Sequence, residues 1–192
     1  MDDYENTSNN LFPALRAIVR AMDTRDIVSA DHSINVMELA CAVGEKMALP
    51  ERELGDLRLA ALFHDIGKIE INEIILCNPN RFSEQDHAIV KRHSEIGEKI
   101  LLAEREDFRP IASCVRHCHE HFDGKGYPDG IEGSDIELNS RIISVADTYD
   151  FLCTDFPFRK AFSTDDAIQE IRRCSGTQFD PEVVKNFVGV IK

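Results

Sequence analysis

The sequence predicts an all-α protein, a single compact helical bundle interrupted by one ordered Gly-Tyr-Pro loop. Apolar residues recur at helical spacing along most of the chain. With 192 residues, 43% of them hydrophobic, the chain is long enough to bury one core. Residues 123–130, Asp-Gly-Lys-Gly-Tyr-Pro-Asp-Gly, are too rich in Gly and Pro for anything but an ordered loop.

The first three helices are predicted by apolar spacing and by the residues at their ends. Asp31 is suited to cap or begin the second helix, and His32 lies in the apolar stripe that follows. Pro50 begins the third helix, because Pro is tolerated in a first turn. His64 shares the apolar face of the third helix, so His32 and His64 are both expected to point inward. The expected helices span residues 11–22, 31–43 and 50–64.

A loop and a fourth helix are expected next. Residues 69–82 lack helical spacing and contain Asn-Pro-Asn, which predicts a loop with at most one short turn of helix. Ser83 caps a helix that runs to residue 100. His93 lies on its apolar face, whereas His87 lies on the other side and is expected to be solvated.

The fifth predicted helix, residues 108–122, holds a dense group of polar side chains. At about 100° per residue, Cys118 lies on the apolar line and His119 at its margin. These two are therefore expected to face the core. The other polar side chains are predicted to turn away from it: His117, Glu120 and His121.

The last three predicted helices span residues 138–153, 164–174 and 181–191. The first is apolar nearly all round, which indicates burial, yet it contains Asp147 and Asp150. A buried carboxylate requires a cation. The two closing helices are expected to serve as packing elements.

An adjacent His64-Asp65 pair at the end of the third helix is followed by Gly67 and Lys68. Alone, this pattern is explained by a helix C-terminus, where His and Lys face the negative end of the dipole. Further groups from other predicted helices change the interpretation, because six converging buried polar side chains would be left unsatisfied without a metal. Mixed imidazole and carboxylate ligands suit Fe, Mn, Zn or Ni rather than Mg or Ca. The full set is His32, His64, Asp65, His93, His119 and Asp147.

The bulk composition excludes some partners. A formal net charge of −13 argues against binding to nucleic acid polymers, since phosphate affinity is built from Lys and Arg. No stretch is long or apolar enough to insert into a membrane. The polar, acidic first residues lack the features of a secretory signal, so a cytoplasmic location is expected. An acidic protein that handles phosphates needs local cations, and bound metals supply them.

Several segments together resemble the HD-GYP phosphodiesterases, a branch of the HD-domain metal-dependent phosphohydrolases. They follow the order and spacing of that family from about residue 22 to the C-terminus. The resemblance divides the chain into a lead-in and first helix, residues 1–21, and an HD-GYP domain, residues 22–192. The matching segments are Arg25-Asp26 with His32-Ser33, residues 62–68, Lys91-Arg92-His93 with Gly97, His119-Glu120 with residues 123–128, and residues 141–147.

The resemblance implies a binuclear metal centre that hydrolyses the second messenger cyclic di-GMP, or a related cyclic dinucleotide, to the linear dinucleotide or GMP. Two divalent transition metals are implied, Fe or Mn first, with Zn or Ni as alternatives. The implied ligands are His32, His64, Asp65 and Asp147 for the first metal, and Asp65, His93 and Cys118 for the second, with His119 as a further metal ligand. Asp65 and Lys68 are the implied catalytic residues. The implied substrate contacts are Lys68, Tyr127, Asp150 and Arg159. A sensor or signalling protein is expected as a further partner.

Three positions depart from the family pattern. Cys118 stands where a ligating His is usual, and Val28 replaces a Glu, which argues against a third metal. Phe156 replaces an Arg that contacts a substrate phosphate, which leaves Arg159 as the cation there. The loss of one charge-assisted phosphate contact costs roughly 1.5–3 kcal/mol. Two other functions stay open: a degenerate domain that binds a nucleotide or a signalling partner, and a mononucleotide phosphohydrolase, against which the intact Gly-Tyr-Pro loop counts.

Overall fold

The computed structural model describes residues 13, 15–24, 31–78, 83–104, 106–156 and 158–191. Within these ranges there is no β-strand, only two isolated bridges, so the all-α prediction is confirmed. The same residues include no helix that is long and apolar enough to cross a membrane. The elements are a helix over residues 15–23, α2 (His32–Lys46), α3 (Glu51–Phe63), η1 (Ile66–Glu70), α4 (Glu73–Leu76), α5 (Glu84–Lys91), α6 (His93–Glu104), η2 (Glu106–Phe108), α7 (Arg109–His117), η3 (Gly133–Asp135), α8 (Leu138–Cys153), α9 (Thr164–Arg173) and α10 (Pro181–Ile191).

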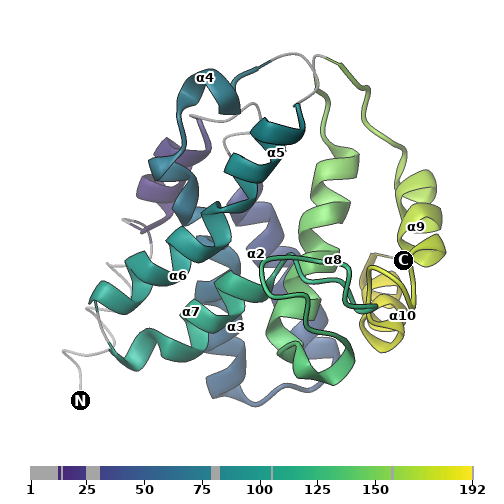
Figure 1. Cartoon of the computed structure of the whole chain (residues 1–192). Coiled ribbons are helices and arrows are strands. Elements are labelled where there is room, and N and C mark those ends of the chain that lie inside the picture. The colour runs from purple at the N-terminus through teal and green to yellow at the C-terminus, as the bar shows by residue number, and fades with distance from the viewer. Residues whose placement is uncertain are drawn as a thin grey trace.

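The core forms where α2 packs against α3 and α8 (Figure 1). Val36 and Val43 of α2, Leu57 of α3, and Ile142 and Val145 of α8 are fully buried there. The closing helices add their own apolar faces to α8 and α2, as expected of packing elements. Because α2 packs against both α3 and α8, the polar residues His32, His64 and Asp147 of these three segments are brought together.

Two predicted elements differ in the structure. The helix expected over residues 83–100 is divided at Arg92 into α5 and α6. Ser83 does cap α5, in a capping box with Asp86. The predicted loop over residues 69–82 is more helical than expected, because η1 begins at Ile66 and α4 forms one turn beyond it. Residues 79–82 lie outside the described part of the chain.

The predicted helix over residues 108–122 is too long. α7 ends at His117, and Cys118 is its C-cap, so helical spacing no longer holds for His119 and Glu120. Glu120 was expected to turn away from the core and is instead 2% exposed. The prediction was wrong because the chain leaves the helix to meet the glycine-rich loop that follows.

Candidate metal centre

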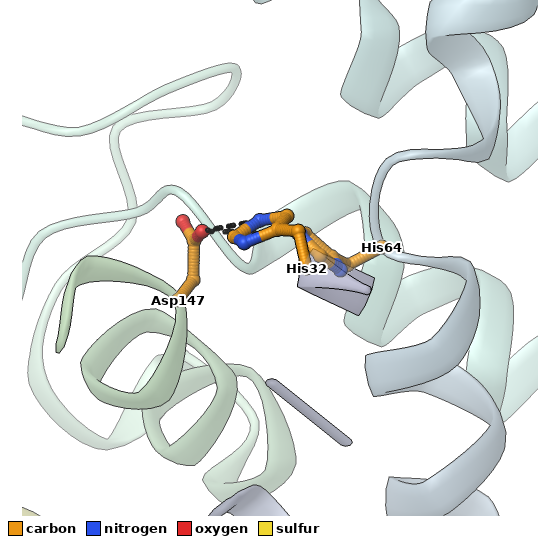
Figure 2. A group of neighbouring side chains, drawn as sticks. All are labelled: His32, His64 and Asp147. Carbon is orange, nitrogen blue, oxygen red and sulfur yellow. Dashed lines mark ion pairs between the residues drawn. The ribbon is translucent and has the colours of Figure 1, made fainter. Parts of the chain in front are cut away.

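Three side chains from three helices form a first group of metal-ligating atoms. His32 begins α2, His64 follows α3, and Asp147 lies in α8; one atom of each lies within 4.8 Å of the others. Figure 2 shows the three side chains directed toward one another. Asp147 Oδ1 is 3.2 Å from His32 Nε2 and 3.8 Å from His64 Nε2.

A second group is formed by Asp65, His93 and His119. His93 Nε2 lies 3.5 Å from Asp65 Oδ1 and 3.0 Å from His119 Nε2. The His93 and His119 rings meet edge to face, with centroids 4.8 Å apart. This arrangement directs two imidazole nitrogens and one carboxylate oxygen to the same point.

Asp65 connects the two groups. Its Oδ2 atom faces the first group, at 3.4 Å from His64 Nε2 and 3.9 Å from His32 Nε2, whereas Oδ1 faces His93. His64 and Asp65 can line the same pocket because α3 ends at Phe63 and the two residues lie in the turn that follows. One oxygen of the Asp65 carboxylate therefore faces each group of candidate ligand atoms.

The three buried histidines are oriented by hydrogen bonds on their other ring nitrogen. Nδ1 of His64 is 2.8 Å from the Ala61 carbonyl, and Nδ1 of His93 is 2.7 Å from the Val90 carbonyl. These carbonyls belong to the last turns of α3 and α5, where helix carbonyls lack intrahelical partners. With Nδ1 donating, Nε2 keeps its lone pair for a metal, which is the usual arrangement of ligating histidines.

His32 is oriented in the same way by a carboxylate, Asp150, whose Oδ2 lies 2.7 Å from Nδ1. The α2 residue next to it, Ser33, is bound through its backbone N–H and hydroxyl to the buried Asp23. Burial lowers the pKa of His32, but hydrogen bonds to Asp147 and Asp150 outweigh this effect and raise the pKa to about 10. The two carboxylates therefore favour positive charge at this position.

The donor atoms fit a bound cation. His64 Nε2 is buried and has no hydrogen-bond partner among the described residues, so it is an orphaned lone pair directed at two carboxylates. Burial lowers the pKa of His93, and burial with the nearby His93 lowers the pKa of His119 to about 3. Both imidazoles are therefore neutral, which is the form that ligates a metal.

Gly67 allows the two groups to approach each other. A Cβ atom at this position would lie 1.9 Å from the His93 carbonyl oxygen and 2.7 Å from the Gly97 nitrogen. η1 therefore packs directly on the backbone of α6, which brings Asp65 to His93. Lys68 extends from the same turn and places Nζ 2.8 Å from Asp65 Oδ2. Burial raises the pKa of Asp65, but Lys68 and the nearby histidines outweigh it, and the carboxyl pKa lies well below its usual range.

Tyr127 of the Gly-Tyr-Pro loop covers the second group. Its ring stacks on His119 at 5.1 Å between centroids, with 13° between the planes. Its backbone N–H donates to the His119 carbonyl at 3.2 Å, and the peptide bond to Pro128 is cis. Lys91 Nζ lies 5.0 Å from the centroid of the same ring. Tyr127 therefore forms one wall beside the candidate metal ligands.

Glu120, which the sequence did not suggest as a functional residue, fastens this loop. Its Oε1 accepts hydrogen bonds from the backbone N–H groups of Asp129, at 2.6 Å, and Gly130, at 2.9 Å. Gly126 approaches so closely that a Cβ atom there would lie 2.4 Å from Glu120 Cα. Two signals were available: the family resemblance includes Glu120 in a matching segment without giving it a role, and the loop's glycine content indicates close backbone approach without identifying the partner.

Charged pairs hold the same loop to α7. Arg116 binds Asp129 through two hydrogen bonds of 2.7 and 2.8 Å, and it also binds Glu98. His117 lies between Asp129 and Glu137, 3.0 and 2.9 Å from them. The loop is therefore tied to α7 at Asp129, two residues after Tyr127.

Cys118 was predicted as a metal ligand, but its sulfur belongs to neither group. Cys118 is 1% exposed, and its thiol donates to the Val115 carbonyl at 3.3 Å. Burial raises its pKa well above the usual range, and the carboxylates of Asp147 and Asp65 raise it further. A thiol ligates as the thiolate, so these surroundings disfavour ligation, and the assignment of Cys118 stays a prediction.

Two predicted substrate contacts have other partners in the structure. Both Asp150 carboxylate oxygens are engaged behind His32, one by its ring and the other by Asn35 at 3.0 Å. Arg159 donates to carbonyls at the end of α8, including those of Phe151 and Leu152. Its guanidinium also lies against three phenylalanine rings, among them Phe156. Asp150 therefore orients a histidine and Arg159 ends a helix in this structure, and their assignment as substrate contacts stays a prediction. Val28 lies outside the described residues.

The HD domain family profile matches residues 14–183. The chain belongs to the HD domain family. Its HD domain is 34% identical over 172 residues to the cyclic di-GMP phosphodiesterase response regulator RpfG of Xanthomonas campestris pv. campestris (strain 8004), which covers 88% of this chain and 45% of that protein. It is 33% identical over 178 residues to the cyclic di-GMP phosphodiesterase PA4108 of Pseudomonas aeruginosa. This alignment covers 93% of this chain and 42% of that protein.

The HD domain also has the fold of solved phosphodiesterases. The crystal structure of a cyclic GMP-AMP specific phosphodiesterase of Vibrio cholerae matches 92% of this chain and 48% of that one, with a TM-score of 0.72 and 22% identity. The predicted fold class is therefore confirmed. The chain spans less than half the length of these relatives.

Proposed function

We propose that this HD domain is a metal-dependent phosphodiesterase of the HD-GYP branch that hydrolyses cyclic di-GMP, or a related cyclic dinucleotide, to the linear dinucleotide or GMP. The observation that carries the proposal is the placement of Asp65, with one carboxylate oxygen toward each of two ligand groups. Relatives that match most of the chain are named as phosphodiesterases of cyclic di-GMP and 3'3'-cGAMP, which supports the same substrate class.

The ligand groups would hold two divalent transition metals, with Fe or Mn preferred and Zn or Ni as alternatives. Asp65 would be shared between them. When bound, such a pair supplies a nucleophile from water at neutral pH and neutralises charge on the phosphorus. The ligands for the first metal are His32, His64, Asp65 and Asp147, and those for the second are Asp65, His93 and His119.

The remaining residues orient the reaction. Lys68 holds its ammonium beside Asp65, where it would meet a phosphate oxygen of the substrate. Asp150 keeps the His32 ring directed at the metal group. Tyr127 would cover the second group and limit the access of water. A signalling partner and a cytoplasmic location stay predictions of the sequence.

The test is to count metals per chain in anaerobically purified protein and to assay cyclic di-GMP turnover with Fe or Mn. Two metals and turnover support the proposal. The Asp65→Ala variant should lose both metal occupancy and turnover, because it lacks the shared ligand. Asp165→Ala, an exposed residue of α9, is the matched control and should keep both. Two metals retained in Asp65→Ala would refute the assignment.

A second candidate function is a catalytically degenerate domain that binds a nucleotide or a signalling partner. The sulfur of Cys118 outside both ligand groups and the aromatic contacts of Arg159 favour it. The same measurements separate the two functions. A degenerate domain would bind cyclic di-GMP without turnover and would hold fewer than two metals.

A further inference from the structure

Lys91 occupies an unusual position for a cation in this acidic chain. It is the last residue of α5, two positions before His93, and its side chain is exposed. Its Nζ lies over the ring of Tyr127, and that ring stacks in turn on His119. One aromatic ring therefore separates the Lys91 ammonium from the second group of candidate ligands.

Other cations around the Gly-Tyr-Pro loop are neutralised by carboxylates. Arg116 pairs with Asp129, Lys125 with Asp123 at 2.7 Å, and Lys68 with Asp65. Among the residues that the structure describes, no such ion pair involves Lys91. In a chain with 35 acidic and 22 basic residues, an ammonium without a carboxylate beside a phosphate-handling centre retains its full charge for an incoming anion.

A cyclic dinucleotide presents two phosphodiester groups to the protein. If one phosphodiester meets the metal ligands and Lys68, the second phosphodiester lies on the opposite side of the cyclic dinucleotide. That second group needs a separate cation. Arg159 is the cation expected from the family pattern, but its guanidinium is bound to the carbonyls at the end of α8. Asp150 is engaged with His32 and carries the wrong charge for a phosphate.

We propose that Lys91 binds the second phosphate of the cyclic dinucleotide, with the Tyr127 ring as the surface that positions its ammonium. This assignment rests on the proposed function and adds a substrate contact to it. The Lys91 side chain is exposed, so its cation–π contact with Tyr127 is weak. A charge-assisted hydrogen bond to phosphate is stronger, so the substrate can draw the ammonium from the Tyr127 ring. Lys91 therefore contributes to binding and leaves the reacting phosphate to the metal groups.

The test compares a substrate that has two phosphates with one that has a single phosphate. Lys91→Ala should weaken cyclic di-GMP binding by about ten- to a hundredfold, measured by calorimetry and as an increase in KM. Its kcat/KM for bis(p-nitrophenyl) phosphate should stay within about twofold of wild type, because that substrate has no second phosphate to bind. Lys91→Arg should recover most of the affinity. Lys99→Ala, an exposed lysine of α6, is the control and should behave as wild type.

The outcomes separate the two proposals. Equal affinities of Lys91→Ala and Lys99→Ala would overturn the assignment of Lys91 and leave the phosphodiesterase proposal intact. An equal loss with both substrates would also overturn it, because Lys91 would then act by supporting the centre. Wild-type protein that binds cyclic di-GMP without hydrolysing it would refute the phosphodiesterase activity, and calorimetry of the Lys91 variants would still decide the phosphate contact.

Discussion

Replacing Gly67 by alanine should separate the two ligand groups while leaving the fold intact. A Cβ atom at this position would lie 1.9 Å from the His93 carbonyl oxygen, and ordinary contact begins at 3.4 Å. The contacted oxygen belongs to the α6 backbone and cannot rotate away as a side chain could, so η1 must move from α6 by about 1.5 Å, since packed interiors have no slack of that size. The same movement would carry Asp65 away from His93 Nε2, now 3.5 Å from Oδ1.

The expected magnitudes follow from this displacement. Overpacking of this kind costs about 1–3 kcal/mol in the free energy of unfolding. A misplacement of ~1 Å among reacting groups lowers the rate by about a hundredfold. The second metal should be lost in Gly67→Ala and the first retained, because the first group also contains His32, His64 and Asp147.

The assay combines metal analysis of anaerobically purified Gly67→Ala, urea unfolding and cyclic di-GMP turnover. Gly55→Ala is the matched control, because a Cβ atom there meets nothing within 4 Å. It lies in α3, where alanine should add about 0.5–1 kcal/mol of stability. Two metals per chain in Gly67→Ala, or stability equal to that of Gly55→Ala, would show that the close contact does not set the distance between the groups.

Three further predictions concern the loop and the buried thiol. Glu120→Ala should speed amide hydrogen exchange at Asp129 and Gly130, because both N–H groups lose their acceptor, and it should raise the KM for cyclic di-GMP. Unchanged exchange would show that Glu120 does not hold the loop in place. Arg116 lowers the pKa of Asp129 from 3.8 to about 2, so this pair stabilises the fold above pH 4 and is lost as the pH falls toward 2. The stability difference between wild type and Asp129→Asn in urea unfolding should therefore shrink over that range, and a constant difference would count against the ion pair. Cys118→Ala should cost about 1 kcal/mol in unfolding free energy and leave metal content unchanged, whereas a loss of metal would restore Cys118 as a ligand.

Helical spacing predicted the elements whose apolar faces are long and continuous. α2, α3 and α8 lie close to their predicted ranges because core packing and local spacing agree there. The division of the fourth helix at Arg92 was missed, because spacing continues across it. At the break, the His93 ring forms a hydrogen bond with the Val90 carbonyl. Helical spacing does not predict a side-chain contact of this kind.

The convergence of the histidines in the two ligand groups was predictable because each lies on or beside an apolar stripe, where an unpartnered imidazole would be costly. Glu120 was missed because the helix was predicted to run to residue 122, five residues beyond the end of α7. Asp150 lies three residues after Asp147 and shares its helix face, so its proximity to the centre could be inferred. Its contact with His32 could not, since that depends on how α2 packs against α8.

The shared Asp65 carboxylate has a thermodynamic consequence for metal loading. An ion held by one of its oxygens withdraws charge from the other, so occupancy of one group alters the affinity of its neighbour, and by linkage the factor is the same in both directions. The first group contains a second carboxylate, Asp147, and the second group has none besides Asp65. If two metals bind as proposed, loading would be stepwise, and the supply of metal would determine how much of the protein carries a complete centre.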